Sequence, residues 1–395
     1  MTIRHIKEHE YDEANYIKYI AFGRKADTLK NDADDPAAIW PDVVVACDDE
    51  NKITARARNI HYTMMFDGRE TPITGVSGVG SLPEARGKGR VRDIIRFVNR
   101  EDRADGNLFS TLYPFSHQFY ARFGYALVSE LDTARFPISA VAPFLKQASY
   151  SVRRHLLEDG FEDMRAIQRA GLKNMNLAQI LTDRQFKKSL GGDPLIHGDY
   201  RYILYNDDKA PIAWLYYTDH ETSEHCTMKV HAAEWVDRKA FISLLSFIAS
   251  FSARYDQVEM PLPTHWPFLS IVPEPKLVTL TRTPNGMARA LDPAAVLRAM
   301  RHPAGAGAYR IAVEDDFLPE NSGVYAVSFN NGAVSVEKTE GAADICCQIG
   351  AFTQLVLGYL TPADMIGRDD VAIHGNEETL NRVFVHKATG LPHHF

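Results

Sequence analysis

The sequence is poor in cysteine, and it shows no spacing of Cys, His or acidic residues typical of a metal site. Only 4 of its 395 residues are cysteine. Cys47 and Cys226 stand alone, and Cys346 and Cys347 are neighbours in a strand-like run. Disulfide frameworks and zinc sites both need regularly spaced cysteines. We therefore expect free, buried thiols and no bound metal.

Long hydrophobic runs and an excess of positive charge are also missing. The most apolar stretch, residues 240–251, is too short to span a bilayer and is interrupted by serine. The 44 Lys and Arg residues are outnumbered by 51 Asp and Glu residues, which argues against general nucleic-acid binding. Residues 1–20 lack the apolar core of a signal peptide. We expect a cytoplasmic protein that binds neither nucleic acid nor membranes.

The composition is that of a folded protein with several domains. Hydrophobic residues make up 45% of the chain and charged residues 24%, and a chain of this length forms two or three domains. Changes in pattern suggest three regions, residues 1–150, 151–284 and 285–395, each with helical and strand-like segments. This alternation predicts an α/β fold with mixed sheets.

Several local patterns predict individual elements. Residues 151–170 and 237–255 have the pattern of helices. Asn331 and Gly332 separate two alternating apolar runs, which predicts a tight hairpin.

Basic residues and glycines gather where a predicted strand turns into a predicted helix. Residues 73–81 are strand-like, and residues 86–92 read RGKGRVR. Val91, Ile94, Ile95 and Val98 have helical spacing. Basic residues at a helix start oppose the helix dipole, which a bound phosphate would relieve. We interpret residues 86–92 as a diphosphate-binding loop; the alternative is a solvated basic loop.

The loop matches neither of two common nucleotide-binding motifs. The GxxxxGK[ST] pattern is absent, and no three-glycine dinucleotide fingerprint opens the chain. A second strand-like segment, residues 107–115, follows, and Ser116 can cap a short helix that ends before Gly124. Tyr120 lies on that helix and points toward the place where the two strands would separate.

Residues 82–92, LPEARGKGRVR, resemble the R-x-x-G coenzyme A loop of the GNAT acetyltransferase superfamily. With FYARFGY at residues 119–125 and a terminal phenylalanine, the whole chain resembles the enhanced intracellular survival family of N-acetyltransferases. The resemblance implies an acetyl-CoA-binding GNAT domain at residues 1–150, a second GNAT-like domain at 151–284 and a sterol-carrier-protein-like domain at 285–395. It also implies a hexamer.

The family's functional residues transfer to matching positions in this sequence. The resemblance implies that Tyr120 is the general acid and the carboxylate of Phe395 the general base. It implies coenzyme binding by the backbone of Val79, Gly80 and Ser81, by the loop residues Gly87, Lys88, Gly89, Arg90, Val91 and Arg92, and by Phe115 and Ser116. Acetyl-CoA is then a co-substrate, and the acceptor is an amine of a small molecule, such as an aminoglycoside or polyamine, or a lysine.

The chemistry of these residues fits acetyl transfer to an amine. A phenol with an ordinary pKa of about 10 is protonated at neutral pH and can donate to a leaving thiolate. Burial would raise the pKa of a terminal carboxylate and make it a better base, while His393 and His394 are alternative bases. Two alternative interpretations remain: Tyr120 could be a packing residue, and Phe395 could be an ordinary chain end docked on the protein. A lipid carrier and a non-catalytic acetyl-CoA sensor are the alternative functions.

Overall fold

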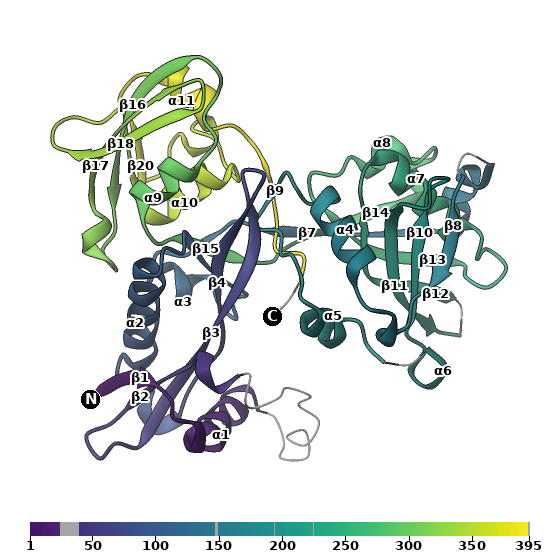
Figure 1. The fold of residues 1–395 in the computed structure, drawn as a ribbon, viewed down its shortest axis with the longest axis horizontal. Coiled ribbons are helices and arrows are strands. Elements are labelled where there is room, and N and C mark those ends of the chain that lie inside the picture. The colour runs from purple at the N-terminus through teal and green to yellow at the C-terminus, as the bar shows by residue number, and fades with distance from the viewer. Residues whose placement is uncertain (24–38, 147–148, 193, 224, 394–395) are drawn as a thin grey trace.

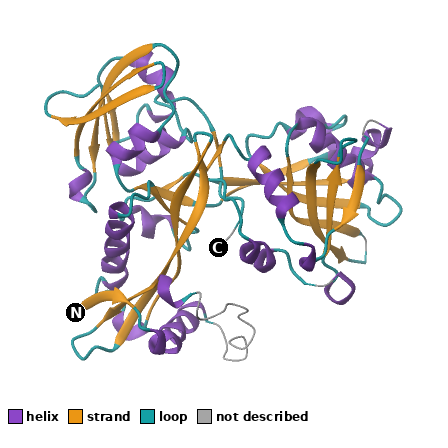
Figure 2. Ribbon diagram, viewed as in Figure 1, coloured by secondary structure: helices purple, strands orange, loops and turns teal. Residues whose placement is uncertain are grey.

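The protein forms three lobes, each built on its own sheet (Figure 1). This computed structural model describes residues 1–23, 39–146, 149–192, 194–223 and 225–393. The C-terminal segment descends from the third lobe and passes between the other two (Figure 1). Helices lie against the sheets of all three lobes (Figure 2).

The first lobe holds a seven-stranded sheet in the order β1-β2-β3-β4-β5-β15-β6. Its strands are β1 (Thr2–His5), β2 (Val43–Cys47), β3 (Ile53–Phe66), β4 (Arg69–Ser81), β5 (Phe109–Leu112), β6 (Ala126–Leu127) and β15 (Met287–Ala290). Its helices are α1 (Tyr11–Phe22), α2 (Arg90–Ala104) and α3 (His117–Ala121). All five residues of β2 are buried, as expected for a continuous apolar strand inside the sheet.

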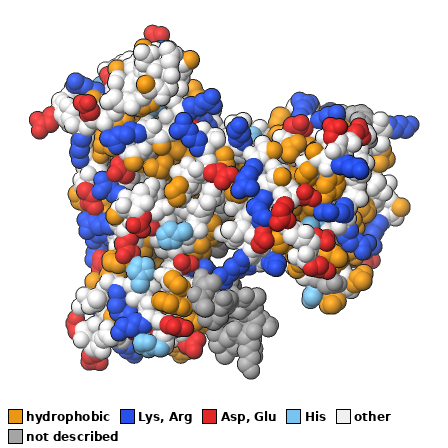
Figure 3. All heavy atoms as spheres, viewed as in Figure 1, with side chains coloured by type: hydrophobic (Ala, Val, Ile, Leu, Met, Phe, Trp, Pro, Cys, Tyr) orange, Lys and Arg blue, Asp and Glu red, His pale blue; other side chains and the backbone are white. Residues whose placement is uncertain are grey.

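Helix α2 forms where the apolar spacing predicts it. Ile94, Ile95 and Val98 are buried against the sheet beside Val44 and Val76. The opposite face carries most of the charged side chains of the helix, as in an amphipathic surface helix, while Asp102 is buried. Figure 3 shows acidic, basic and apolar side chains interspersed on one face of the molecule.

The second lobe holds another seven-stranded sheet, in the order β14-β7-β13-β12-β11-β10-β8. Its strands are β7 (Glu130–Pro137), β8 (Ser151–Arg154), β10 (Tyr200–Tyr205), β11 (Pro211–Glu221), β12 (Cys226–Trp235), β13 (Gln257–Pro263) and β14 (Thr279–Pro284). Its helices are α4 (Glu162–Gly171), α5 (Asp183–Ser189), α6 (Pro194–His197), α7 (Arg238–Ala249) and α8 (Phe268–Ile271).

The third lobe holds a five-stranded sheet in the order β18-β17-β16-β19-β20. Its strands are β16 (Ala306–Glu314), β17 (Gly323–Asn330), β18 (Ala333–Thr339), β19 (Ile345–Gln348) and β20 (Val371–Ile373), with helices α9 (Pro293–Ala299), α10 (Ile349–Leu357) and α11 (Glu377–Val383). The hairpin predicted at Asn331 and Gly332 is confirmed, because these two residues join β17 to β18 and both have positive φ.

Two strands cross between the lobes. Strand β7 lies before residue 150 in the sequence but pairs in the second sheet, and β15 lies after residue 284 but pairs between β5 and β6 in the first. Residues 1–150 thus contribute a strand to the second sheet, and residues 285–395 contribute one to the first. The prediction of one helix over residues 151–170 is wrong at its start: residues 151–154 form the edge strand β8, paired with β10, and α4 begins only at Glu162.

The C-terminal segment is held by a two-stranded sheet. Strand β21 (Ala388–Thr389) pairs in parallel with β9 (Met175–Asn176), whose segment also hydrogen-bonds β3 of the first lobe. The four cysteines are free, but the prediction that they are buried is right only for Cys47 and Cys347, since Cys226 and Cys346 are partly exposed. Within the described ranges, every helix is too short or too polar to cross a membrane.

Candidate active site

The first sheet splits between the parallel strands β4 and β5. Their pairing runs from Thr74 opposite Ser110 to Val76 opposite Leu112 and then stops. A bulge follows in β4, where the pairing with β3 shifts and Gly78 has a φ of 56°. A bulge bends its strand, so the last residues of β4 separate from β5. Their backbone groups facing β5 are left without a strand partner.

A glycine loop connects the split strand to α2. Gly87 and Gly89 both have a φ of 75°, a left-handed conformation that costs other residues free energy. Gly89 is the N-cap of α2, and it has no side chain to accept from the first N–H groups of the helix. The start of α2 therefore presents backbone donors that an anion can use.

No carboxylate of the described residues pairs with the cations of residues 86–90. Among the described residues, Arg86, Lys88 and Arg90 have no ion-pair partner, and the buried Nε of Arg90 has no hydrogen-bond acceptor. From its third residue onward, α2 pairs its arginines with carboxylates: Arg92 and Arg96 with Asp93, Arg100 with Glu320, and Arg103 with Asp292. Within the part of the chain that the structure describes, the arginine of α2 left without an ion pair is therefore the one at its start, Arg90.

A cavity of about 860 Å³ opens where the split strands, the loop and α3 meet. Such a volume is typical of small-molecule and cofactor sites. Its lining combines backbone of β4 with basic and aromatic side chains: Ala21, Phe22, Val79, Gly80, Ser81, Ala85, Arg86, Gly87, Gly89, Arg90, Val91, Arg92, Arg96, Phe115, Phe119, Arg122, Phe123, Asp316 and Phe317.

Helix α3 places an aromatic cluster beside the cavity. Ser116 caps the helix as predicted, since its side chain accepts from the N–H of Phe119 at 3.2 Å. The Tyr120 ring lies 5.5 Å from the Phe115 ring and 5.1 Å from the Phe119 ring. Its side chain is buried, which raises its pKa above the ordinary value for a phenol. The hydroxyl is therefore protonated at neutral pH, and no described residue hydrogen-bonds it.

The C-terminal segment docks next to the split. The Tyr113 hydroxyl, just beyond β5, donates to the carbonyl of Leu391 at 3.0 Å and to that of His393 at 2.5 Å. The side chain of Asn285 also donates to the Leu391 carbonyl, at 2.9 Å. Tyr113 is partly buried, and burial raises its pKa. The chain is thus fixed through His393 at the end of β5.

A buried polar network anchors His393 to the second lobe. Its Nε2 lies 2.9 Å from Oε1 of Glu234, and the side chains are 9% and 6% exposed. The same carboxylate accepts from Trp214 Nε1 at 2.7 Å and from Gln168 Nε2 at 3.2 Å. This network occupies the imidazole of His393, so the histidine serves as an anchor in this conformation.

The structure brings most of the predicted coenzyme-binding residues together. The cavity is lined by Val79, Gly80, Ser81, Gly87, Gly89, Arg90, Val91, Arg92 and Phe115, and it is not lined by Lys88, Ser116 or Tyr120. Tyr120 is instead buried, with its ring packed against those of Phe115 and Phe119. Phe395 and His394 lie outside the described residues. The described residues contain no cluster of metal-binding side chains.

Sequence reasoning missed several cavity residues. Arg122 and Phe123 lie within the FYARFGY segment, whose full length could have indicated them. Ala21 and Phe22 come from the end of α1. Asp316 and Phe317 come from the third lobe, and no local pattern indicates a contact between residues more than 200 positions apart in the chain.

Three models of protein families match consecutive parts of the chain. The acetyltransferase (GNAT) domain matches residues 2–128, a second acetyltransferase (GNAT) domain matches residues 182–299, and the sterol carrier protein domain matches residues 293–392. The chain is therefore an acetyltransferase of the GNAT class with two such domains and a sterol-carrier-protein-like domain. This confirms the predicted fold class.

Solved structures share the complete architecture at low sequence identity. A GCN5-related N-acetyltransferase from Anabaena variabilis ATCC 29413 is 17% identical, with a TM-score of 0.88 and 100% of both chains covered. A probable N-acyltransferase of unknown function from Enterococcus faecalis V583 is 18% identical, with a TM-score of 0.87 and coverage of 100% of this chain and 99% of that one. A search of curated proteins gave no match.

Eis1 from Mycobacterium abscessus has the same fold along its entire length. It is 17% identical to this chain, with a TM-score of 0.83 and 100% of both chains covered. With the two GNAT domains, this structural match confirms the resemblance to the enhanced intracellular survival proteins at the level of fold.

Proposed function

We propose that this chain transfers an acetyl group from acetyl-CoA to an amine of a small molecule or of a lysine side chain. The observation that carries the proposal is the glycine loop, whose unpaired cations and open helix start face a cavity at the split between β4 and β5. GNAT domains use acetyl-CoA, and this arrangement offers an anion site beside a strand with free backbone groups.

The described residues fit acetyl-CoA. Gly87, Gly89 and the first N–H groups of α2 would hold the diphosphate, together with the cations of residues 86–92 and the orphaned Nε of Arg90. The backbone of Val79, Gly80 and Ser81 would hold the pantetheine and the acetyl end. Phe115 lines the cavity and, at 73% exposure, can cover the coenzyme. Ser116 supports this wall by capping α3.

The bulged end of β4 would polarise the reacting carbonyl. The co-substrate supplies an activated acyl group as a thioester. Backbone N–H groups beyond Val76 face the split without a strand partner, and fixed donors of this kind stabilise the oxyanion of acyl transfer. The glycines of β4 let a ligand approach this backbone closely.

Tyr120 would act as the general acid. Burial raises its pKa, so its hydroxyl keeps the proton at neutral pH until the leaving sulfur takes it. The Tyr120 ring packs against Phe115 and Phe119 and does not line the cavity, so proton transfer requires these rings to rearrange when the coenzyme binds.

The terminal carboxylate of Phe395 would act as the general base that accepts the proton of the amine. The supporting observation is the fixed course of the chain up to His393, whose carbonyl is bound by Tyr113 beside the split. Two residues further, the chain end would be near the reacting atoms, and burial there would raise the pKa of the carboxylate.

The carrier hypothesis has weaker support. It requires a large apolar cavity within residues 285–395. The side chains facing inward from the third sheet and α10, such as Ile311, Val327, Ile345 and Phe352, pack into one buried cluster instead. The acetyl-CoA sensor remains as the alternative that the experiment below separates. The hexamer and the cytoplasmic location stay predictions from the resemblance and the sequence.

The test is an acetyl-CoA consumption assay with polyamines, aminoglycosides and lysine peptides as acceptors. We expect turnover with at least one amine class, and strongly reduced turnover when one glycine is added after Phe395, because the carboxylate is displaced. Binding of acetyl-CoA without turnover on any amine would favour the sensor. Full activity of the extended chain would remove Phe395 from the mechanism.

A further inference from the structure

Two side chains of the third lobe, Asp316 and Phe317, line the cavity beside the glycine loop. The Phe317 ring lies 5.1 Å from the ring of Phe123, which follows α3, and 4.7 Å from the guanidinium of Arg96 on α2. Nε of Arg96 also donates to the carbonyl of Phe317 at 3.3 Å. Phe317 therefore joins the third lobe to both helices that flank the cavity.

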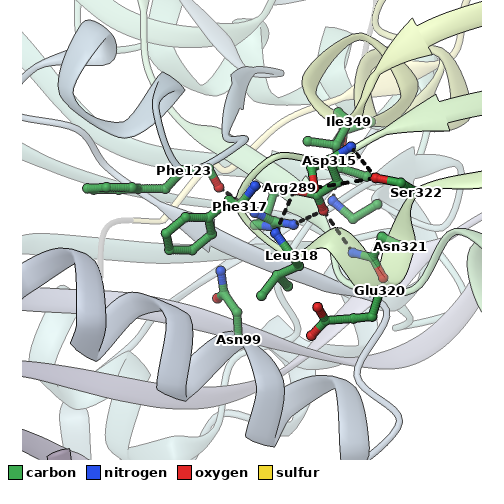
Figure 4. A network of polar contacts seen from close by, with 12 residues as sticks. Asn99, Phe123, Arg289, Asp315, Phe317, Leu318, Glu320, Asn321, Ser322 and Ile349 are labelled. Atoms are coloured by element: carbon green, nitrogen blue, oxygen red, sulfur yellow. Dashed lines mark hydrogen bonds and ion pairs between the residues drawn. The ribbon is translucent and has the colours of Figure 1, made fainter.

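A buried ion pair fixes this part of the wall. Arg289 of β15 pairs with Asp315, and both side chains are fully buried (Figure 4). The Asp315 carboxylate accepts from the N–H groups of Phe317 at 3.1 Å and Leu318 at 2.9 Å, while Arg289 donates to the carbonyl of Phe123. Removing one partner would leave a buried charge uncompensated. The pair thus holds Phe123 and Phe317 together, so the wall exists before any ligand binds.

The chemistry of this wall differs from that of the glycine loop. The exposed guanidinium of Arg122 lies 4.9 Å from the Phe119 ring. Arg122, Asp316 and Phe317 line both this cavity and an adjoining one of about 480 Å³, so they stand where the two meet. Aromatic rings and guanidinium planes stack on nucleobases, and arginine binds phosphate. Together they suit a purine nucleotide that carries a phosphate.

We propose that the third lobe, through Asp316 and the cavity-facing edge of Phe317, contacts the nucleotide end of coenzyme A, with that edge toward the adenine and Arg122 at the 3′-phosphate. The proposal rests on the proposed use of acetyl-CoA. In that molecule the diphosphate lies between the pantetheine and the 3′-phosphoadenosine. If the split strands hold the acetyl end and the glycine loop holds the diphosphate, the nucleotide extends to a remaining wall of the same cavity. The sterol-carrier-protein-like domain then forms part of the coenzyme site.

The test measures dissociation constants by calorimetry on the full chain with three ligands: acetyl-CoA, acetyl-dephospho-CoA and S-acetyl phosphopantetheine. Phe317→Ala should weaken acetyl-CoA binding about tenfold, the scale of a lost base–aromatic contact. It should leave binding of S-acetyl phosphopantetheine unchanged, because that ligand has no adenosine. Arg122→Ala should abolish the preference of the wild type for acetyl-CoA over acetyl-dephospho-CoA.

Arg100→Ala is the matched control. Arg100 of α2 pairs with Glu320 of the third lobe at 2.8 Å, yet it does not line the cavity that holds the glycine loop. Its loss should loosen the contact between the lobes without changing any of the three constants. Equal weakening of all three ligands by Phe317→Ala, or an unchanged acetyl-CoA constant in both Phe317→Ala and Arg122→Ala, would overturn the proposal. If the wild type binds none of the ligands, the proposed function itself fails. Arg122 is exposed, so its variant keeps the test valid if Phe317→Ala does not fold.

Discussion

The two GNAT domains of this chain share a topology but differ at the start of their central helices. In each, a parallel strand pair is connected through a helix: β4 and β5 through α2, and β12 and β13 through α7. The first helix begins at Gly89, which has no side chain. The second begins after Asp237, whose carboxylate accepts from the N–H of Ala240 at 2.8 Å. In the second domain the Asp237 carboxylate is the anion at the helix start. In the first domain that position is open to an anionic ligand.

The second domain also fills the space beside its helix start. The rings of Trp235 and Phe241 lie 4.4 Å apart, and Trp266 lies 5.1 Å from Trp235 and 5.3 Å from Phe241. In the first domain the corresponding region opens into the cavity. One anionic cap and three aromatic rings thus account for the difference between a packed scaffold and a candidate site. The predictions below test this contrast in order of decreasing expected effect.

Removing the Tyr120 hydroxyl should give the largest change. We expect Tyr120→Phe to lower kcat by roughly 100- to 10,000-fold, the usual contribution of a general acid, with the dissociation constant of acetyl-CoA nearly unchanged. The measurement is steady-state kinetics beside calorimetry. Tyr125→Phe is the matched control, since its hydroxyl bonds Ser110 at 2.7 Å and has no proposed part in the chemistry. Wild-type kcat in Tyr120→Phe would mean that the aromatic cluster only packs.

What the sequence revealed about this site was local. The apolar spacing of α2, the glycines of the loop and the serine cap of α3 each depend on residues within a few positions of one another. They therefore predicted the loop and the helix start, while the binding role of Val79, Gly80, Ser81 and Phe115 came from the family resemblance. The side chain of Tyr120 depends on packing, and its ring packs against Phe115 and does not line the cavity.

The rest depends on pairing between distant segments. Nothing near Met287 indicates that β15 inserts between β5 and β6, because register with a strand 180 residues earlier is not encoded in local pattern. The same holds for Phe317 in the cavity wall and for His393 against Glu234. The short edge strand β8 was mistaken for a helix, since four residues are too few to show strand periodicity.

The two helices also differ in the residues that pack them against their sheets. Helix α7 packs through apolar residues such as Leu244 and Ile248, whereas α2 carries the buried Asp102. That carboxylate accepts from Thr74 and Asn59, both at 2.7 Å, and burial raises its pKa from 3.8 to about 6. A raised folded-state pKa means that its stabilising contribution is complete below pH 3.8 and is lost as pH rises through 6.

Asp102→Asn should therefore remove the pH-dependent contribution of this carboxyl group to the free energy of unfolding. Relative to wild type, the free energy of unfolding of the variant should improve by up to about 3 kcal/mol between pH 4 and pH 7.5, from 1.36 kcal/mol for each pKa unit. Urea unfolding of both proteins at the two pH values measures this. A difference between variant and wild type that is equal at both pH values would show that Asp102 titrates normally.

The smallest effects are expected from substitutions at the two helix starts, Gly89 of α2 and Asp237 of α7. Gly89→Val forces a β-branched residue into a left-handed conformation and places its Cβ about 2.8 Å from Nη2 of Arg92. Strain of about 1–3 kcal/mol, relieved by distorting the loop, should weaken acetyl-CoA binding roughly 5- to 150-fold. Asp237→Ala should cost about 1 kcal/mol of stability through the lost cap and leave the dissociation constant unchanged. If Asp237→Ala weakened the coenzyme as much as Gly89→Val, both domains would contribute to binding and the contrast between them would fail. If neither variant weakened acetyl-CoA binding, the glycine loop would be a solvated basic turn and the coenzyme would lie elsewhere.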